Sequence, residues 1–150
     1  MHFQINRTDH KNRDFINLVN LLDVELAETD GDEHTFYAQF NGINTLDHVL
    51  VVYVEQEAIA CGAFKEFDDH TVEIKRMYVK PKDRKLQIAS QMLAQLELWA
   101  KELEYTRCIL ETGIRQGAAV GLYQKNMYQV INNYGQYKGI ENSICFEKWL

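Results

Sequence analysis

A strand, a helix and a second strand follow one another in the middle of the chain, and this order constrains the fold more than any other feature. Residues 86–103 carry apolar side chains three and four positions apart, a spacing that indicates an amphipathic helix. The runs at 71–79 and 106–111 on either side are rich in strand-forming residues, and Pro81 ends the first run. We therefore expect the helix to cross over the sheet from one strand to the other.

The rest of the chain adds hairpins and helices to this unit. Turn-forming residues at 68–70 predict an antiparallel hairpin between the strands on either side. Asp9 is the expected N-cap of an amphipathic helix that Gly31 ends, and a short second helix is expected at 36–40. The order predicts an α+β, or mixed α/β, fold in a single domain of residues 1–150. The remaining expected elements are strands at 2–6, 49–54, 58–67, 128–132 and 144–149 and a short helix at 118–125.

Composition and charge argue against several classes of protein. The 150 residues carry a net charge of −6, whereas a general nucleic-acid binder needs clustered Lys and Arg for phosphate contacts. No signal-peptide core is visible at the N-terminus and no apolar run approaches the length of a membrane span, so we expect no membrane association. Cys61, Cys108 and Cys145 form no CxxC pair, which predicts buried free thiols in a reducing cytoplasm.

The sequence predicts no metal site. The five histidines include no pair at a spacing typical of metal ligands. The acidic and histidine residues at 68–70 are better explained as a polar hairpin turn.

Positive charge is concentrated where the central strand passes into the long helix. Residues 75–85 contain six basic side chains and one acid. Because the first turn of a helix presents unpaired N–H groups and the positive end of its dipole, added Arg and Lys favour a diphosphate site there. Basic runs also occur on solvated turns, and charge alone does not decide between the two interpretations.

Motifs along nearly the whole chain occur in the order and at the spacing of one known family. They start with Val72-Glu73-Ile74-Lys75-Arg76-Met77-Tyr78-Val79-Lys80-Pro81 and continue through residues 84–89, Leu110-Glu111-Thr112-Gly113, Tyr134-Gly135-Gln136-Tyr137 and residues 143–148. In these motifs the sequence resembles the GNAT superfamily of N-acetyltransferases, of the single-domain bacterial type. The resemblance implies a central twisted, mostly antiparallel sheet of about six to seven strands, flanked by about four helices.

The resemblance also implies acetyl-CoA as the co-substrate. The family pattern Gln/Arg-x-x-Gly-x-Gly/Ala is matched by Arg84 at its first position and by Ala89 at its last, and the backbone amides of this loop would hold the diphosphate. The strand backbone at 77–79 would pair with the pantetheine arm. The residues assigned to the cofactor in this way are Met77, Tyr78, Val79, Arg84, Lys85, Leu86, Gln87, Ile88, Ala89, Ser90, Gln116 and Ala119.

Chemistry in this family is the direct attack of an amine on the thioester, without a metal. Glu73 matches the strand position that often carries the general base, and Tyr123 matches the helix tyrosine that often protonates the leaving thiolate. A backbone N–H near Val79 would polarise the acetyl carbonyl. From the residues alone, Glu73 could instead be a solvent-facing strand acid and Tyr123 a half-buried aromatic.

Four positions depart from the family pattern. Gln87 and Lys85 stand where Gly is usual in the diphosphate loop, and the amide of Gln87 is kept for binding if its φ is negative. Met127 stands where Gly usually precedes an aromatic residue, so we expect a different local turn. Gln116 stands where many members have Asn, and either amide can bind the cofactor.

The resemblance leaves the acceptor open as a primary amine of a small molecule or a peptide. Residues 1–34 hold eight acids and three bases, and such an acidic wall would attract a cationic amine. Phe36, Tyr37 and Phe40 would shape the apolar part of that pocket, or they pack on the sheet beneath a solvated helix face. Two other functions remain open: a noncatalytic acyl-CoA-binding or regulatory module on the same fold, and an interaction protein without a cofactor. The apolar strand at the C-terminus is compatible with a homodimer.

Overall fold

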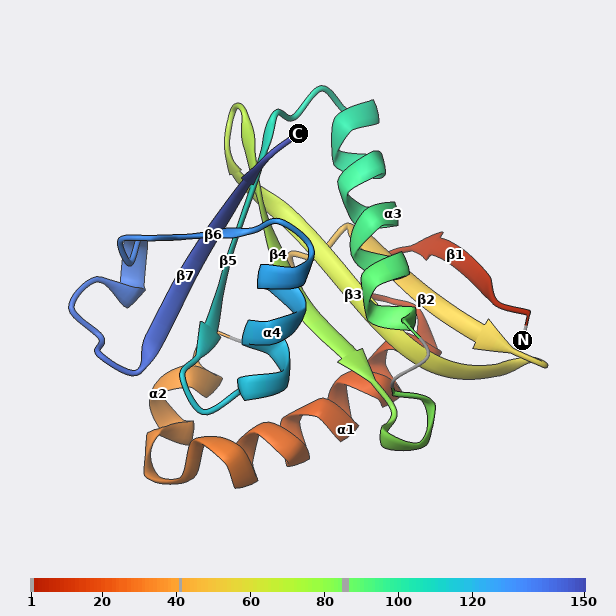
Figure 1. Ribbon diagram of the computed structural model, residues 1–150. Helices are drawn as coiled ribbons and strands as arrows, with labels where there is room; N and C mark the ends of the chain where they lie inside the picture. Colours follow the sequence, from red (N-terminus) through yellow and green to blue (C-terminus); the bar gives the residue numbers. More distant parts are fainter. Residues whose placement is uncertain (1, 41, 85–86) are drawn as a thin grey trace.

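A seven-stranded sheet runs through the part of the chain that the structure describes, and its strands lie in the order β1-β2-β3-β4-β5-β7-β6 (Figure 1). The computed structural model describes residues 2–40, 42–84 and 87–150. The strands are β1 (Gln4–Thr8), β2 (His48–Val54), β3 (Glu57–Asp68), β4 (Thr71–Val79), β5 (Arg107–Gly113), β6 (Gln129–Ile131) and β7 (Ser143–Trp149). The helices are α1 (Arg13–Asp30), α2 (His34–Ala38), α3 (Ile88–Glu102) and α4 (Gly117–Lys125), with short 3-10 turns η1 (Gly31–Glu33), η2 (Pro81–Asp83) and η3 (Gly135–Tyr137).

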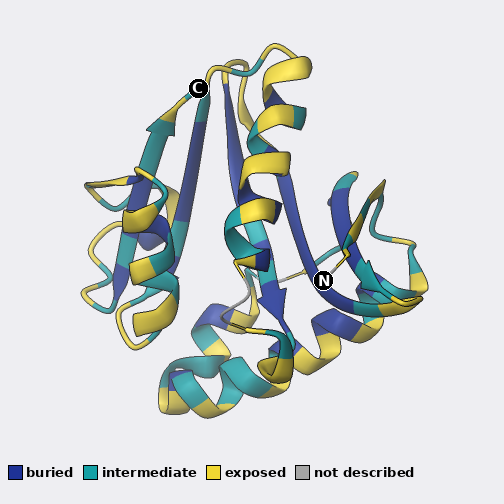
Figure 2. Ribbon diagram, turned by 45° about the vertical axis from the view of Figure 1, so that its right-hand side comes forward, coloured by how far each residue is buried: buried dark blue, intermediate teal, exposed yellow. Residues whose placement is uncertain are grey.

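The strand pairing is antiparallel everywhere except between β4 and β5. These two strands pair in parallel, with α3 as the crossover between them, and the pairing covers only the first residues of each strand, from Thr71↔Arg107 to Glu73↔Ile109. Beyond that point the two strands diverge, as the views in Figures 1 and 2 both show. The predicted mixed, mostly antiparallel sheet is therefore confirmed, and its centre is open along the last two thirds of β4, residues 74–79.

Helices cover both faces of the sheet. On one face α3 and α4 pack over a core that includes Phe64, Met92 and Phe146, all fully buried. On the other face α1 packs on β2 and β3 through Phe15 and Leu18. The colouring in Figure 2 shows that burial is concentrated on the strands between these layers. The three cysteines are free and buried, as predicted.

Some element boundaries differ from the sequence prediction. Side-chain hydrogen bonds determine which residue caps a helix, and apolar periodicity does not report them. Asn12, not Asp9, caps α1: its Oδ1 accepts a 2.9 Å hydrogen bond from the N–H of Phe15. Asp9 instead accepts from the N–H of Lys11 in the preceding turn. Gly31 does end α1, at a φ of 57°. The long helix begins at Ile88, and the expected start at residue 86 lies outside the described residues.

A β-bulge interrupts β4 at Arg76. Between the pairs Ala63↔Lys75 and Cys61↔Tyr78, three steps along β4 face two steps along β3, and Arg76 takes a φ of 59°. The Arg76 side chain is buried and donates to Asp23 on α1 at 2.5 Å, which ties the helix to the bulge. The bulge bends the strand where it runs free of β5, so the backbone at 77–79 is turned toward the opening.

None of the helices in the described ranges is long and apolar enough to cross a membrane.

Candidate active site

A cavity of about 860 Å³ lies at the divergence of β4 and β5. Its walls come from α1, from β4 between Glu73 and Val79, from the start of α3, and from β5 and α4. Tyr37 on α2 and Tyr137 on η3 line it from the side opposite α3. Because β5 leaves β4 after Glu73, the facing edge of β4 has no strand partner there, and an extended ligand could pair with it.

The structure brings the expected cofactor residues to this one cavity. Lys85 and Leu86 lie outside the described residues. The remaining ten residues all line the cavity: Met77, Tyr78, Val79, Arg84, Gln87, Ile88, Ala89, Ser90, Gln116 and Ala119.

The first turn of α3 faces the cavity with its backbone amides available. Gln87 is the N-cap, and its side chain makes no capping hydrogen bond to that turn. The amides of Ile88, Ala89 and Ser90 therefore need partners from outside the helix, which is the usual setting for anion binding. Gln87 has a φ of 61°, so the condition of a negative φ is not met: this position keeps the left-handed backbone that glycine adopts without strain.

Met127 shows the same behaviour at the end of α4. Its φ is 74°, in the left-handed region that glycine favours, so the expected change in the local turn is wrong. The N–H of Tyr128 donates to the carbonyl of Tyr123 at 3.0 Å, which closes the helix as a glycine at position 127 would. At both positions the fold imposes the glycine-like conformation on a residue with a side chain.

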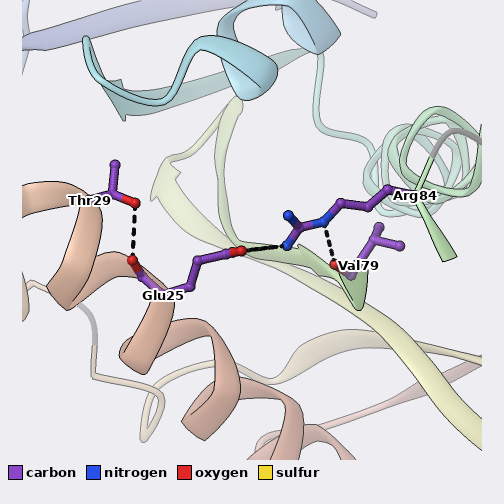
Figure 3. Close-up of polar contacts among 4 residues, drawn as sticks. All are labelled: Glu25, Thr29, Val79 and Arg84. Carbon is purple, nitrogen blue, oxygen red and sulfur yellow. Dashed lines mark hydrogen bonds and ion pairs between the residues drawn. The ribbon is translucent and has the colours of Figure 1, made fainter. Parts of the chain in front are cut away.

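Arg84 joins the β4–α3 loop to α1 across the cavity (Figure 3). Its Nη2 donates to both carboxylate oxygens of Glu25, at 2.8 and 2.9 Å, and its Nε donates to the carbonyl of Val79 at 2.8 Å. The hydroxyl of Thr29 donates to the carbonyl of Glu25 one helical turn along. The Arg84 side chain thus ties the loop to Val79 and to α1, and it leaves the amides of the first turn of α3 for a ligand.

Glu73 lies at the buried end of the cavity. It is 3% exposed, so the alternative of a solvent-facing strand acid is excluded. Its Oε2 accepts a 2.6 Å hydrogen bond from the hydroxyl of Tyr134 and lies 3.8 Å from Nζ of Lys75. Burial lowers the pKa of Lys75, and the neighbouring Glu73 carboxylate opposes that shift. The pair supplies a carboxylate and an ammonium side by side next to the open edge of β4.

Glu111 on β5 is a second cavity carboxyl, which the sequence analysis did not single out as a site residue. Burial raises the pKa of Glu111 to about 7, and its Oε2 is buried without a hydrogen-bond partner. The available signal was an acid directly after the apolar run at 108–110, on the same face of the strand as the buried Ile109. A carboxyl that titrates near neutral pH can bind a cation or hold a proton.

Tyr123 reaches the cavity from α4. It is buried, and its ring packs against Tyr128 and Phe146 at centroid distances of 5.8 and 5.9 Å. Burial raises the pKa of its hydroxyl, so the phenol stays protonated at neutral pH. This is the protonation state that a proton donor needs.

The expected acidic wall is reduced to two residues at the cavity. Of the acids in residues 1–34, Glu25 and Asp30 line it. Of the three aromatic residues Tyr37 alone lines the cavity, and Phe36 and Phe40 pack in the same cluster as Tyr37 and Tyr137 without reaching it. Within the described ranges, no three His, Cys, Asp or Glu side chains come together as ligands for a metal ion.

Fold and cavity together define an acyl-CoA N-acyltransferase architecture. A Klebsiella pneumoniae protein assigned to the acyl-CoA N-acyltransferases superimposes with a TM-score of 0.83 at 32% identity, over 99% of this chain and 97% of its own. The N-acetyltransferase PaiA of Thermoplasma acidophilum, solved in complex with coenzyme A, has the same fold, with a TM-score of 0.75 at 17% identity over the full length of both chains.

The chain belongs to the GNAT acetyltransferase family, whose model matches residues 15–127. An "IAA acetyltransferase" of Azospirillum brasilense is 31% identical over 100 residues, which are 66% of this chain. The match spans 65% of that relative's length and 42% of the length of a Xenopus tropicalis relative.

Proposed function

We propose that the protein is an acetyl-CoA-dependent N-acetyltransferase that moves an acetyl group to a primary amine of a small molecule or peptide. The observation that carries this proposal is the cavity itself. One continuous space joins the amides at the start of α3, the unpaired edge of β4, the hydroxyl-bearing Tyr123 and the carboxyls of buried Glu73 and half-buried Glu111.

The shape and polarity of the cavity fit acetyl-CoA. The diphosphate would lie at the first turn of α3, where the amides at 88–90 lack helical partners. The pantetheine arm would extend along β4 at 77–79, because that edge offers backbone groups to an extended ligand. Gly117, Ala118 and Gly121 line the opposite wall on α4, and such small side chains leave room for the arm. Bound acetyl-CoA supplies the activated acetyl thioester.

In the proposed mechanism three groups of this chain serve the transfer. Glu73 takes the proton from the attacking amine, and Tyr134 and Lys75 hold its carboxylate in place. The backbone N–H of Val79 donates to the acetyl oxygen as negative charge develops on it. Tyr123 gives its proton to the departing thiolate. The raised pKa of the Tyr123 hydroxyl keeps that proton in place until the thiolate leaves.

Two measurements test the proposal in order. Calorimetric titration with acetyl-CoA and with CoA is expected to show micromolar affinity, about −8 kcal/mol. A screen of primary amines with acetyl-CoA then measures turnover by release of CoA. Binding without turnover would support the noncatalytic acyl-CoA module, and no binding at millimolar ligand would favour the interaction protein.

Exchange of Glu73 for Gln tests the proposed base. We expect Glu73→Gln to lower kcat most at low pH, where removing a proton from the amine is hardest. Glu141→Gln is the matched control, because Glu141 is exposed and lies outside the cavity. A pH–rate profile of Glu73→Gln that keeps the wild-type shape would remove Glu73 from the role of base.

A further inference from the structure

Within the described part of the chain, two carboxyls in the cavity lack the neighbouring cation that Glu73 has in Lys75. Asp30, at the end of α1, is 7% exposed, and Glu111 lies on β5; both line the cavity. Among the described residues neither carboxylate has a Lys, Arg or His nitrogen within 4.0 Å, whereas Glu73 has Lys75. Burial raises the pKa of both Asp30 and Glu111. A buried carboxylate without a cation is costly, and a cationic ligand would remove that cost.

The neighbours of the two carboxyls leave this excess negative charge in place. The charge of Lys75 lowers the pKa of Glu111, but the Lys75 ammonium lies against Glu73. Beside Asp30, Gln116 contributes a neutral amide, while His34 lowers and Glu33 raises the pKa of the Asp30 carboxyl. The exposed Arg115 donates to the backbone carbonyl of Asp30, not to its carboxylate. With Glu73 and Lys75 balancing each other, two carboxyls remain for a ligand at this end of the cavity.

The backbone of β5 sets the spacing between the two strand positions beside which the carboxyls lie. Asp30 Oδ1 lies 3.8 Å from where a Cβ on Gly113 would be, so its carboxylate lies over that glycine. Gly113 follows Glu111 by two residues, which places the two positions on one face of the strand about 6.6 Å apart. Two ammonium groups separated by about four methylenes span this distance.

Aromatic rings form the wall at this end of the cavity. Tyr37 and Tyr137 are 8% and 3% exposed and line the cavity, and Tyr37 is fixed by a 3.0 Å hydrogen bond with Ser143. Ring faces attract ammonium groups, which adds to the attraction of the carboxylates. Tyr137 packs against Phe40 and Tyr134, and Tyr37 packs against Phe36, so the wall is rigid and favours a small acceptor.

We propose that the acceptor is a small aliphatic diamine, with its reacting amino group at Glu111 and its second ammonium at Asp30. This inference rests on the proposed function, because it names the acceptor of the same site. The nitrogen at Glu111 bonds to the acetyl carbon as the carbon–sulfur bond breaks. The reacting group binds as an ammonium and gives up two protons. The first passes to Glu73 and frees the nitrogen for attack, and the second replaces the proton that Tyr123 gives to the thiolate. The second ammonium is unchanged.

A matched pair of amines tests the proposal. The ratio of kcat/KM for 1,4-diaminobutane to that for butylamine, which lacks only the second amine, is expected to be about tenfold or more in the wild type. Asp30→Asn is expected to bring the ratio close to one, mainly through KM for the diamine. Asp32→Asn is the matched control, because Asp32 is exposed and outside the cavity, and it should keep the wild-type ratio.

Binding of 1,4-diaminobutane to the protein saturated with CoA separates this proposal from the proposed function. Diamine binding that Asp30→Asn weakens about tenfold would support the diamine site even without turnover. Equal use of both amines by wild type and Asp30→Asn would overturn the diamine proposal and leave the acetyltransferase standing. Absence of both acetyl-CoA binding and acetyl transfer would overturn the two together.

Discussion

The hydroxyl of Tyr134 donates a 2.6 Å hydrogen bond to Oε2 of Glu73, although the two residues are 61 positions apart in the chain. Tyr134 precedes η3 and Glu73 lies on β4, so the contact joins the C-terminal third of the chain to the centre of the sheet. The contact fixes one oxygen of the carboxylate and leaves the other for a substrate. Several predictions about the site depend on such contacts.

Tyr134→Phe removes the hydroxyl that holds Glu73 and keeps the ring that packs against Phe67 and Tyr137. We expect kcat to fall about tenfold, equivalent to about 1.4 kcal/mol, because the carboxylate is then less well oriented. Affinity for acetyl-CoA, measured by calorimetry, should stay at the wild-type value. A parallel loss of acetyl-CoA affinity would show that Tyr134 supports the cavity as a whole.

Tyr123→Phe tests the proposed proton donor while preserving the packing of its ring. Turnover should fall by about 10² or more, because the thiolate then leaves without a proton. The Kd for acetyl-CoA should change much less, since the phenol is expected to act late in the reaction. Equal turnover of variant and wild type would remove Tyr123 from this role.

Glu111 predicts a pH dependence of activity near neutrality. Its pKa of about 7 means that the ionised form, which would attract the acceptor ammonium, is gained as pH rises through 7. We expect kcat/KM for the amine to rise between pH 6 and 8. Glu111→Gln should flatten that rise; a variant whose profile still climbs with an apparent pKa of about 7 would point to another group.

The same carboxyl predicts a pH dependence of stability. Its pKa is raised from an ordinary 4.5 to about 7, so the folded protein binds a proton that the unfolded chain releases. The resulting stabilisation is complete below about pH 4.5 and is lost as pH rises through 7. Urea unfolding should therefore show Glu111→Gln gaining about 3 kcal/mol over the wild type between pH 5 and 8. A difference that does not vary with pH would contradict the shift.

Glycine at the two left-handed positions should relieve strain. Gln87→Gly and Met127→Gly are each expected to raise the free energy of unfolding by about 1 kcal/mol, because a Cβ is unfavourable at φ values of 61° and 74°. Gln87→Gly should also tighten acetyl-CoA binding, since it lies at the first turn of α3. Met127→Gly serves as its control and should leave that affinity unchanged. A loss of stability in both variants would show that contacts of the two side chains outweigh the backbone strain.

The central strand, the long helix and their order followed from the sequence because each depends on local periodicity. Residues 71–79 were predicted as a strand and form β4 with those bounds, since β-branched residues and Pro81 act locally. The bulge at Arg76 was not predictable, because no glycine marks its left-handed backbone. That conformation is imposed by the partner strand and by the ion pair with Asp23.

In the candidate site, too, local motifs were predictable and contacts between distant elements were not. Motif spacing led to Glu73, Tyr123 and the α3 loop, which meet in one cavity. The partners of Glu73 and the position of Asp30 over Gly113 depend on contacts between distant elements, which spacing does not report. The roles of Glu73 and Tyr123 remain predictions for the experiments above.

The buried cysteines bear on how this protein would tolerate free CoA, the product of the proposed reaction. Burial raises the pKa of Cys61 and Cys108 to about 12 and that of Cys145 to about 11, so none forms a thiolate at neutral pH. Thiol–disulfide exchange requires a thiolate that attacks a disulfide, and these three residues offer none to the disulfide that released CoA would form on oxidation in air. Mixed disulfides with CoA should therefore not accumulate, and the native protein should keep its activity during storage without a reducing agent.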